Sequence, residues 1–316
     1  MQSKNSSRVK TTGTGRPSSK WSLKDIAAST LQNIEEGLYE LDGSTYNLES
    51  AIKHTNENTS FYAADSNLSE WSTRTRDTDA PTRRGGLKII VSECSVLVGT
   101  RRLKGDVDSV LGLEDKRVGV LNFASAKNPG GGFIRGAQAQ EESIARSSTI
   151  YPSLMTETGQ KFYQPHKKDP KEGYYSHAMI YSPRVLFFRA DKGTWLPPIE
   201  ADVLTSAAVN AGVVRRYLRQ RNSVDESELD AAMKERMARV LYLFELRGVR
   251  HLVLGSFGTG VFRNRVELVA GVWKELLVGE HARFKDSFDR VVFAVLGSAT
   301  FKVFEETFAD VGGSWT

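Results

Sequence analysis

The hydrophobic pattern changes character near residue 87. From there to the end of the chain, short apolar runs of strand length alternate with longer segments whose apolar residues recur at helical spacing. The runs that predict strands are 87–91, 118–123, 201–206, 251–254 and 291–296. The segments that predict helices are 138–150, 227–246, 264–278 and 299–308. Strands that alternate with helices predict an α/β fold with a largely parallel sheet.

Two helical segments carry start signals. Ser22 and Asp25 have the spacing of a capping box, and an apolar stripe follows over 23–38. Ser227 and Asp230 have the same spacing at the start of the longest helical segment, which Gly248 is expected to end. We therefore expect helices to start at both serines.

The N-terminal quarter of the chain is mostly polar. Residues 1–20 contain no acidic residue and are expected to form a disordered basic tail. Residues 21–86 are predicted to be an accessory region, in which the polar stretch 42–86 adds little to the core. Residues 87–316 are predicted to form the main domain.

Charge and composition narrow the function classes. The 43 basic and 38 acidic residues give a net charge of +5, which suits a polyanionic partner without requiring one. The single cysteine, Cys94, excludes an internal disulfide and a cysteine-rich zinc site, and the five histidines lack metal-binding spacing, so we expect no metal. No apolar run reaches the roughly 20 residues that cross a bilayer, and the start of the chain lacks a signal core. The predicted location is intracellular, in cytoplasm or nucleus.

Two glycine-rich segments follow predicted strands and lead into helices. They are 122–142 (NFASAKNPGGGFIRGAQAQEE) and 255–264 (GSFGTGVFRN). In such sheets, ligands bind beyond the carboxyl ends of the strands. Glycine permits close backbone approach, and the exposed N–H groups and helix starts bind anionic oxygens. Two such loops side by side are suited to a diphosphate, although neither matches the P-loop or the dinucleotide-binding pattern.

Acidic residues stand at the end of the first glycine-rich segment. Taken alone, Gln140-Glu141-Glu142 is a charged first turn of a helix, and Glu142 has the spacing to pair with Arg146. The preceding triple glycine changes this interpretation, because it places the carboxylates beside a predicted phosphate site. Hydrogen-bonding side chains suited to a sugar come from Asn122, Ser125 and Asn128.

The string PGGGF, followed by Gln140-Glu141-Glu142, resembles the GGG…QEE signature of the poly(ADP-ribose) glycohydrolases. Together with GAQAQEESIARSSTIYPSL and VLGSFGTGVFRN, it is most similar to their microbial-type branch, in segment order over roughly residues 22–308. The resemblance implies a macrodomain fold: a mixed, largely parallel sheet flanked by helices, here with an N-terminal helical accessory region. It also implies that neither a metal nor a cofactor is needed.

The resemblance assigns roles to individual residues. Glu142 corresponds to the catalytic acid, and Glu141 to a residue that binds sugar hydroxyls next to the scissile bond. The triple glycine would wrap the distal ribose and phosphate, and the second loop would form the other wall of the diphosphate site. The broader family has an asparagine near Ser125 that orients this ribose, a role for which Asn122 and Asn128 are candidates. The full expected substrate-binding set is Asn122, Ser125, Asn128, Gly130, Gly131, Gly132, Phe133, Gln140, Gly258, Thr259, Gly260, Val261 and Phe262.

The implied reaction is hydrolysis of the ribose–ribose O-glycosidic bond of poly(ADP-ribose), with Glu142 as general acid and then base. The two adjacent glutamates diverge by about 100° on a helix, so an opposed carboxylate pair is not expected. The implied partners are the polymer or ADP-ribosylated proteins, with ADP-ribose as product ligand, and the expected state is a monomer.

Three alternatives stay open. One is a macrodomain that binds ADP-ribose without cutting it. Another is an enzyme that removes single ADP-ribose units from proteins or hydrolyses a small ADP-ribose ester. Direct nucleic-acid binding ranks last, because the charge excess is small and no stacking platform is evident.

Overall fold

A computed structural model describes residues 21–73, 86–113 and 115–313. Its helices are α1 (Leu23–Glu36), α2 (Glu49–Asn58), α3 (Val96–Ser109), α4 (Gln140–Ser147), α5 (Ile150–Met155), α6 (Glu157–Lys168), α7 (Ala211–Gln220), α8 (Ser227–Leu246), α9 (Val266–Leu277) and α10 (Ser298–Thr307). Its strands are β1 (Leu38–Leu41), β2 (Ser44–Asn47), β3 (Ser60–Tyr62), β4 (Lys88–Ser92), β5 (Val118–Phe123), β6 (Met179–Arg189), β7 (Trp195–Ser206), β8 (His251–Leu254), β9 (Arg290–Ala294) and β10 (Gly312–Gly313). Short 3₁₀ turns are η1 (Asn67–Glu70), η2 (Phe133–Arg135) and η3 (Lys171–Gly173).

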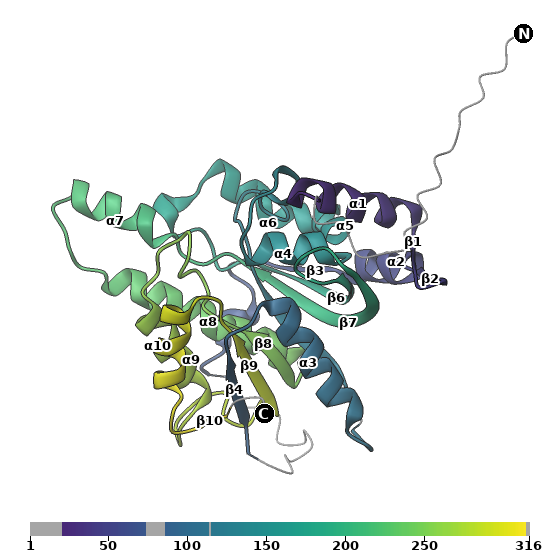
Figure 1. The fold of residues 1–316 in the computed structure, drawn as a ribbon. Coiled ribbons are helices and arrows are strands. Elements are labelled where there is room, and N and C mark those ends of the chain that lie inside the picture. Colours follow the sequence, from purple (N-terminus) through teal and green to yellow (C-terminus); the bar gives the residue numbers. More distant parts are fainter. Residues whose placement is uncertain (1–20, 74–85, 114, 314–316) are drawn as a thin grey trace, which may run out of the picture.

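An eight-stranded mixed sheet forms the centre of the molecule (Figure 1). The strand order is β10-β4-β9-β8-β5-β7-β6-β3. The strands from β10 to β7 run parallel, and β6 and β3 are antiparallel at one edge. Helices cover both faces, which confirms the predicted α/β class and its largely parallel sheet.

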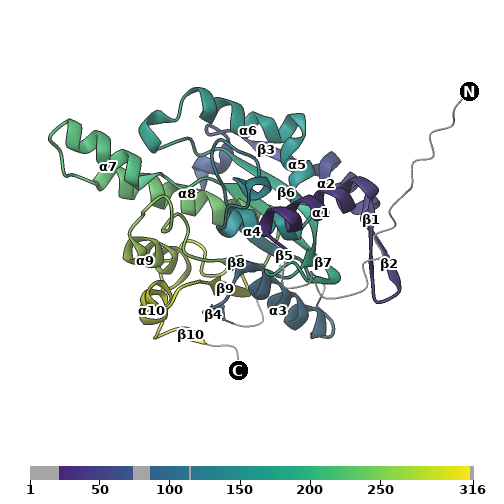
Figure 2. The same cartoon turned by 45° about the horizontal axis from the view of Figure 1, so that its top comes forward.

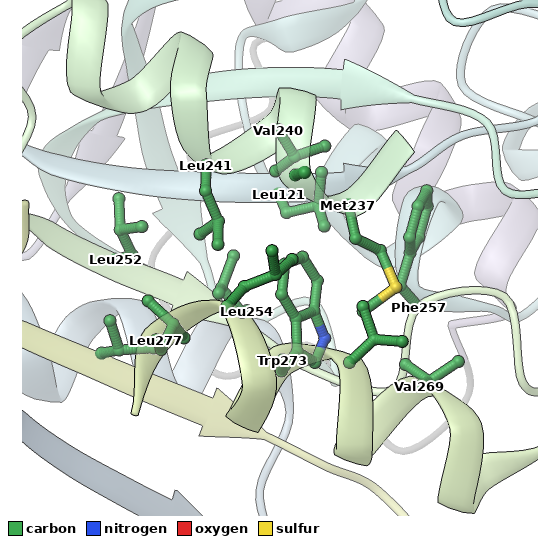
Figure 3. Close-up of a cluster of buried hydrophobic side chains, with 14 of the residues drawn as sticks. Leu121, Met237, Val240, Leu241, Leu252, Leu254, Phe257, Val269, Trp273 and Leu277 are labelled. Carbon is green, nitrogen blue, oxygen red and sulfur yellow. The ribbon is translucent and has the colours of Figure 1, made fainter. Parts of the chain in front are cut away.

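The larger apolar core fills the space between the sheet and helices α8 and α9. Figure 3 shows Leu121 of β5 beside Met237 and Val240 of α8, with Trp273 of α9 below them. The residues predicted to face inward from the 227–246 helix are all buried: Leu229, Met233, Met237, Val240 and Phe244. A second core on the opposite face packs α3 to α6 against the sheet.

The predicted helix over 138–150 is two helices, α4 and α5. Between them, Ser148 bridges to Phe187, and the Thr149 N–H donates to the Leu186 carbonyl at 2.9 Å. The Thr149 hydroxyl also accepts from the Leu186 N–H at 3.0 Å. Pairing with β6 therefore replaces helical hydrogen bonds at this point, which the local pattern does not reveal.

The two predicted capping boxes have different outcomes. At α1, Ser22 accepts from the Asp25 N–H, and the Asp25 carboxylate accepts from the Ser22 N–H at 2.8 Å, which confirms the first box. The second box is wrong. The Ser227 N–H donates to Asp225 at 2.9 Å, and Asp230 binds Arg265 instead. An acid two residues upstream thus satisfies the start of α8.

The polar stretch 42–86 contributes more to the core than predicted. Leu48 and Leu68 are fully buried, and Trp71 donates to Glu235 of α8 at 2.8 Å. Strand β3 pairs with β6 and so extends the central sheet. The expectation of little core was wrong, because apolar residues of 42–73 pack into the core or against α8. The predicted domain boundaries stay a prediction, and the tail 1–20 lies outside the described residues.

Candidate functional site

The two glycine-rich loops leave neighbouring parallel strands at the same edge of the sheet. Strands β5 and β8 pair over Val118–Val120 and 251–253, and the loops begin after Phe123 and Leu254. The ring of Phe123 packs on that of Phe257, with centroids 5.5 Å apart. The two loops therefore start side by side, as parallel strands require.

The first loop closes over both glutamates of α4. The Gly132 N–H donates to Glu142 Oε1 at 2.9 Å, and the Ser125 N–H donates to Glu141 Oε2 at 2.6 Å. Gly131 has φ +61°, and a Cβ on it would lie 2.3 Å from Glu142 Oε1 and 3.0 Å from Glu141 Oε2. Only glycine fits there. The expected divergence of the two carboxylates is wrong, since both converge on Gly131.

Gln140-Glu141-Glu142 does not form a charged turn at the surface, which is how the segment would be interpreted on its own. Glu141, Glu142 and Arg146 are all buried. Within the described part of the chain, Glu142 forms no ion pair with Arg146, whose guanidinium donates to the Ala137 carbonyl. The loop backbone, rather than a surface ion pair, holds this end of α4.

The environment of Glu141 favours its neutral form. Burial raises the pKa of the Glu141 carboxyl well above its ordinary value, and the charge of Glu142 adds to the rise, while the Ser125 N–H bond opposes it. Tyr163 of α6 is also buried, and burial and the charge of Glu141 both raise its pKa. Helix α6 was not predicted, although Phe162 and His166 have the spacing of one helix face.

Gln140 uses its side-chain amide within the protein. Its Nε2 donates to the Leu121 carbonyl at 2.6 Å, and its Oε1 accepts from the Phe123 N–H at 2.9 Å. Strand β8 pairs with β5 only as far as Val120. Beyond that point, the side chain of Gln140 forms hydrogen bonds with the backbone of β5 in place of β8. The amide expected to bind substrate is therefore engaged by β5.

The other predicted residues of the first loop lie in different environments. Asn122 is buried and donates to Thr205 at 3.2 Å, and its Oδ1 has no hydrogen-bond partner among the described residues. The Ser125 hydroxyl accepts from the N–H of Asn128, whose own side chain is exposed. Phe133 is buried in the core, 5.0 Å from the ring of Tyr151. Its side chain thus packs inside the protein, and its assignment to substrate binding stays a prediction.

Two buried side chains anchor the backbone of the second loop through hydrogen bonds. Trp273 donates to the Gly255 carbonyl at 3.0 Å, and Asn264 donates to the Gly258 carbonyl at 3.0 Å. Gly258 has φ +74°, and a Cβ on it would lie 2.4 Å from Ala208. Sequence reasoning did not identify these two anchoring residues.

The tip of the second loop is open to solvent. Gly260 and Val261 are exposed, and Thr259 is half-buried with its hydroxyl on the Ser256 carbonyl at 3.0 Å. Phe262 is half-buried, 5.9 Å from the ring of Tyr175. In residues 21–73, 86–113 and 115–313, no cluster of metal-ligating side chains occurs, and no helix is long and apolar enough to span a membrane.

Comparisons with known proteins agree with this geometry. Residues 27–190 match the family model described as "Microbial-type PARG, catalytic domain", a range that includes the first loop and the predicted boundary at 86–87. No curated protein matches the chain.

Solved structures match over most of the chain. A poly(ADP-ribose) glycohydrolase from Thermomonospora curvata, bound to the inhibitor ADP-HPD, is 34% identical, with a TM-score of 0.76 over 90% of this chain and 99% of that one. A poly(ADP-ribose) glycohydrolase from Deinococcus radiodurans, in complex with ADP-ribose, is 30% identical, with a TM-score of 0.70 over 86% of this chain and 99% of that one.

Proposed function

Because the chain belongs to the microbial-type poly(ADP-ribose) glycohydrolase family, we propose that it hydrolyses the ribose–ribose O-glycosidic bond of poly(ADP-ribose) and releases ADP-ribose. One observation carries the proposal: two buried glutamates converge on Gly131, beside a second glycine loop on the neighbouring strand. A phosphate site and an acid thus lie at the same edge of the sheet, as cleavage of a bond near a diphosphate requires.

Glu142 acts as the general acid and then as the general base. Cleavage passes through an oxocarbenium-like state, and Glu142 gives its proton to the departing ribose oxygen as the C–O bond breaks. The resulting carboxylate takes a proton from the water that attacks the anomeric carbon, which restores the acid. Because Oε1 accepts from the Gly132 N–H, Oε2 is the oxygen left for the substrate.

Glu141 and Asn122 bind the sugar. Glu141 Oε1 and Asn122 Oδ1 are buried atoms without a hydrogen-bond partner among the described residues. Buried polar atoms in folded proteins are nearly always paired, so these two atoms are suited to ribose hydroxyls, which can both donate and accept. The backbone N–H groups of the second loop hold the diphosphate, whose charge stabilises the developing cation.

The proposed partners are poly(ADP-ribose) or ADP-ribosylated proteins, with ADP-ribose as the product. We propose an intracellular, monomeric enzyme that acts in cytoplasm or nucleus. The geometry around Glu142 favours catalysis over binding alone, because a reader would need the glycine loops but not a buried acid held against the first of them.

Release of free ADP-ribose from labelled polymer tests the function. The wild-type chain should release it, and Glu142→Gln should abolish turnover while ADP-ribose affinity stays within about tenfold, since loss of the acid removes transition-state stabilisation. Glu157→Gln is the matched control, because it removes an exposed first-turn acid from α6. Near-normal release by Glu142→Gln would contradict the assignment, and binding without release by the wild type would favour a reader.

A panel of substrates tests the specificity. Polymer, mono-ADP-ribosylated protein and a small ADP-ribose ester are compared at equal concentrations. The proposal expects the polymer to be the fastest, and faster release from the mono-modified protein would contradict it.

A further inference from the structure

Helix α7 has two chemically different faces. Gly212, Arg215, Arg216 and Arg219 stand at i, i+3, i+4 and i+7 and so lie along one face. On the other face, Val214, Tyr217 and Leu218 line a cavity of about 430 Å³. We call the three arginines of α7, together with Arg263, the arginine stripe.

The stripe begins at the second glycine loop. The Gly212 N–H donates to the Phe262 carbonyl at 3.1 Å, and Arg215 donates to the Arg263 carbonyl at 2.6 Å. The Cδ of Arg263 lies 3.3 Å from the position of a Cβ on Gly212. From this junction the stripe runs outward for about 10 Å, at about 1.5 Å per residue, along a helix that projects from the molecule (Figures 1 and 2).

Three cations of the stripe have no acidic partner within the described ranges. Arg215 binds Glu226 through two nitrogens, at 2.7 and 2.9 Å. Arg216 and Arg263 are exposed and outside any ion pair of the described chain. Arg219 is also exposed, and its Nε donates only to the Arg215 carbonyl, at 3.1 Å.

The nearby acids do not neutralise these cations. Asp230 binds Arg265, and Asp225 accepts from the N–H of Ser227 at the start of α8. Glu228 lines the cavity on the other face of α7. Exposed guanidinium groups present planar forks that match phosphate oxygens, so the stripe offers an anion-binding surface continuous with the loop that the proposed function assigns to the diphosphate.

We propose that the arginine stripe binds the units of poly(ADP-ribose) that lie beyond the unit being cleaved. This inference rests on the proposed function. A polymer anchored by one diphosphate at the second loop presents further diphosphates along its length, and three unpaired arginines leading away from that loop complement this repeated negative charge. The stripe would therefore increase affinity for long polymer without changing affinity for ADP-ribose.

Binding to the Glu142→Gln protein, which should not degrade its ligand, tests the stripe. The variant adds Arg216→Ala and Arg219→Ala, which lie on α7 outside the second loop. The Kd for long polymer should rise about tenfold at low salt, and the slope of log Kd against log salt should fall by about 1.4, since each contact to a single strand contributes about 0.7. The Kd for ADP-ribose should not change.

The control removes two exposed cations elsewhere: Lys161→Gln and Lys302→Gln. It should leave the Kd for long polymer and the salt slope near those of the parent protein. An unchanged polymer Kd in the stripe variant, or an equal loss for ADP-ribose, would overturn the inference. Tighter binding of the stripe to duplex DNA than to polymer would also overturn it. Failure of the proposed function itself would appear separately, as no release of ADP-ribose by the wild type.

Discussion

Gln140 joins the start of α4 to β5 through both ends of its side-chain amide. The bonds to the Leu121 carbonyl and the Phe123 N–H lie where β8 no longer pairs with β5. Since Glu141 and Glu142 follow directly, the amide sets the position of both carboxylates relative to the first loop. Gln140 is thus a positioning residue.

Gln140→Glu should lower both stability and kcat. The substitution keeps the shape but puts an oxygen 2.6 Å from the Leu121 carbonyl, where the amide now donates. We expect a loss of about 1–3 kcal/mol in the free energy of unfolding and a fall of about tenfold or more in kcat as the acid is displaced. Denaturant unfolding and steady-state kinetics measure the two effects.

Gln138→Glu is the control, because Gln138 is exposed in the same loop and should show neither effect. A rise in KM alone, with normal stability, would instead assign Gln140 to substrate binding, as the sequence suggested. The motif could identify which residues matter, but not what they contact. For example, the role of Glu142 stays a prediction from the resemblance, and the motif did not indicate that the side chain of Phe133 is buried.

At the scale of elements, α1 braces the helix that carries the glutamates. The Thr30 hydroxyl is buried and donates to the Arg146 carbonyl of α4 at 2.6 Å. The side chain of Lys24 lies over Gly136, 3.2 Å from the position of a Cβ there. The N-terminal helix therefore supports the site, although the sequence suggested only an accessory element.

Thr30→Val should reduce kcat as well as stability. It removes the hydroxyl at nearly constant shape and leaves a buried carbonyl unpaired, which should cost about 1–2 kcal/mol in the free energy of unfolding. The matched control is Thr55→Val, since Thr55 of α2 makes a similar bond to the Pro183 carbonyl at 2.9 Å. Both should lose similar stability in a denaturant titration. Equal kcat values for the two variants, well below their melting temperatures, would contradict a bracing role for α1.

Local pattern predicted several elements with regular apolar spacing, but it missed others, including helices α3, α6 and α7. Helices α8, α9 and α10 and strands β5, β8 and β9 lie within two residues of their predicted positions. Strand β6 was missed because Ser182, Pro183 and Arg184 interrupt its apolar run, at a shift in the register with β7. The first half of β7 was not predicted, because it is half-buried and contains two prolines, which are typical of loops and edge strands.

At the scale of the whole molecule, two histidines are held neutral between the elements around the site. His166 is buried in α6, where burial and the charge of Arg236 lower its pKa to about 4. His177 faces the guanidinium of Arg236 at 3.3 Å, and burial and that charge lower its pKa to about 3. An unfolded chain would protonate both near pH 6.5.

Stability should therefore fall as the pH falls from 6.5 towards 4. The depressed pKa of His166 means that the unfolded chain binds more protons in this window, so its contribution is present above pH 6.5 and is lost below it. For His166 the loss from pH 7 to pH 4 is about 3 kcal/mol. In denaturant titrations at both pH values, His166→Gln should show a decrease smaller by about that amount. His281→Gln, at an exposed position, is the control, and an equal decrease in both variants would refute the assignment.

The order of the strands in the sheet could not be predicted from local sequence patterns. Parallel pairing of β5 with β8 follows from the α/β pattern, but the pairing of β3 with β6 joins residues more than a hundred positions apart. Such contacts depend on packing between distant segments rather than on local spacing.

These distant contacts also set the order in which the site can be completed during synthesis. Thr30 meets its partner 116 residues later, and the Trp71 carbonyl accepts from Arg283, 212 residues later. The hairpin β1–β2 is too small to be stable alone, so the N-terminal segment cannot fold stably until its partners have been synthesised. The N-terminal segment is thus synthesised long before the partners that it contacts, and folding should be slow compared with a helical bundle of similar size.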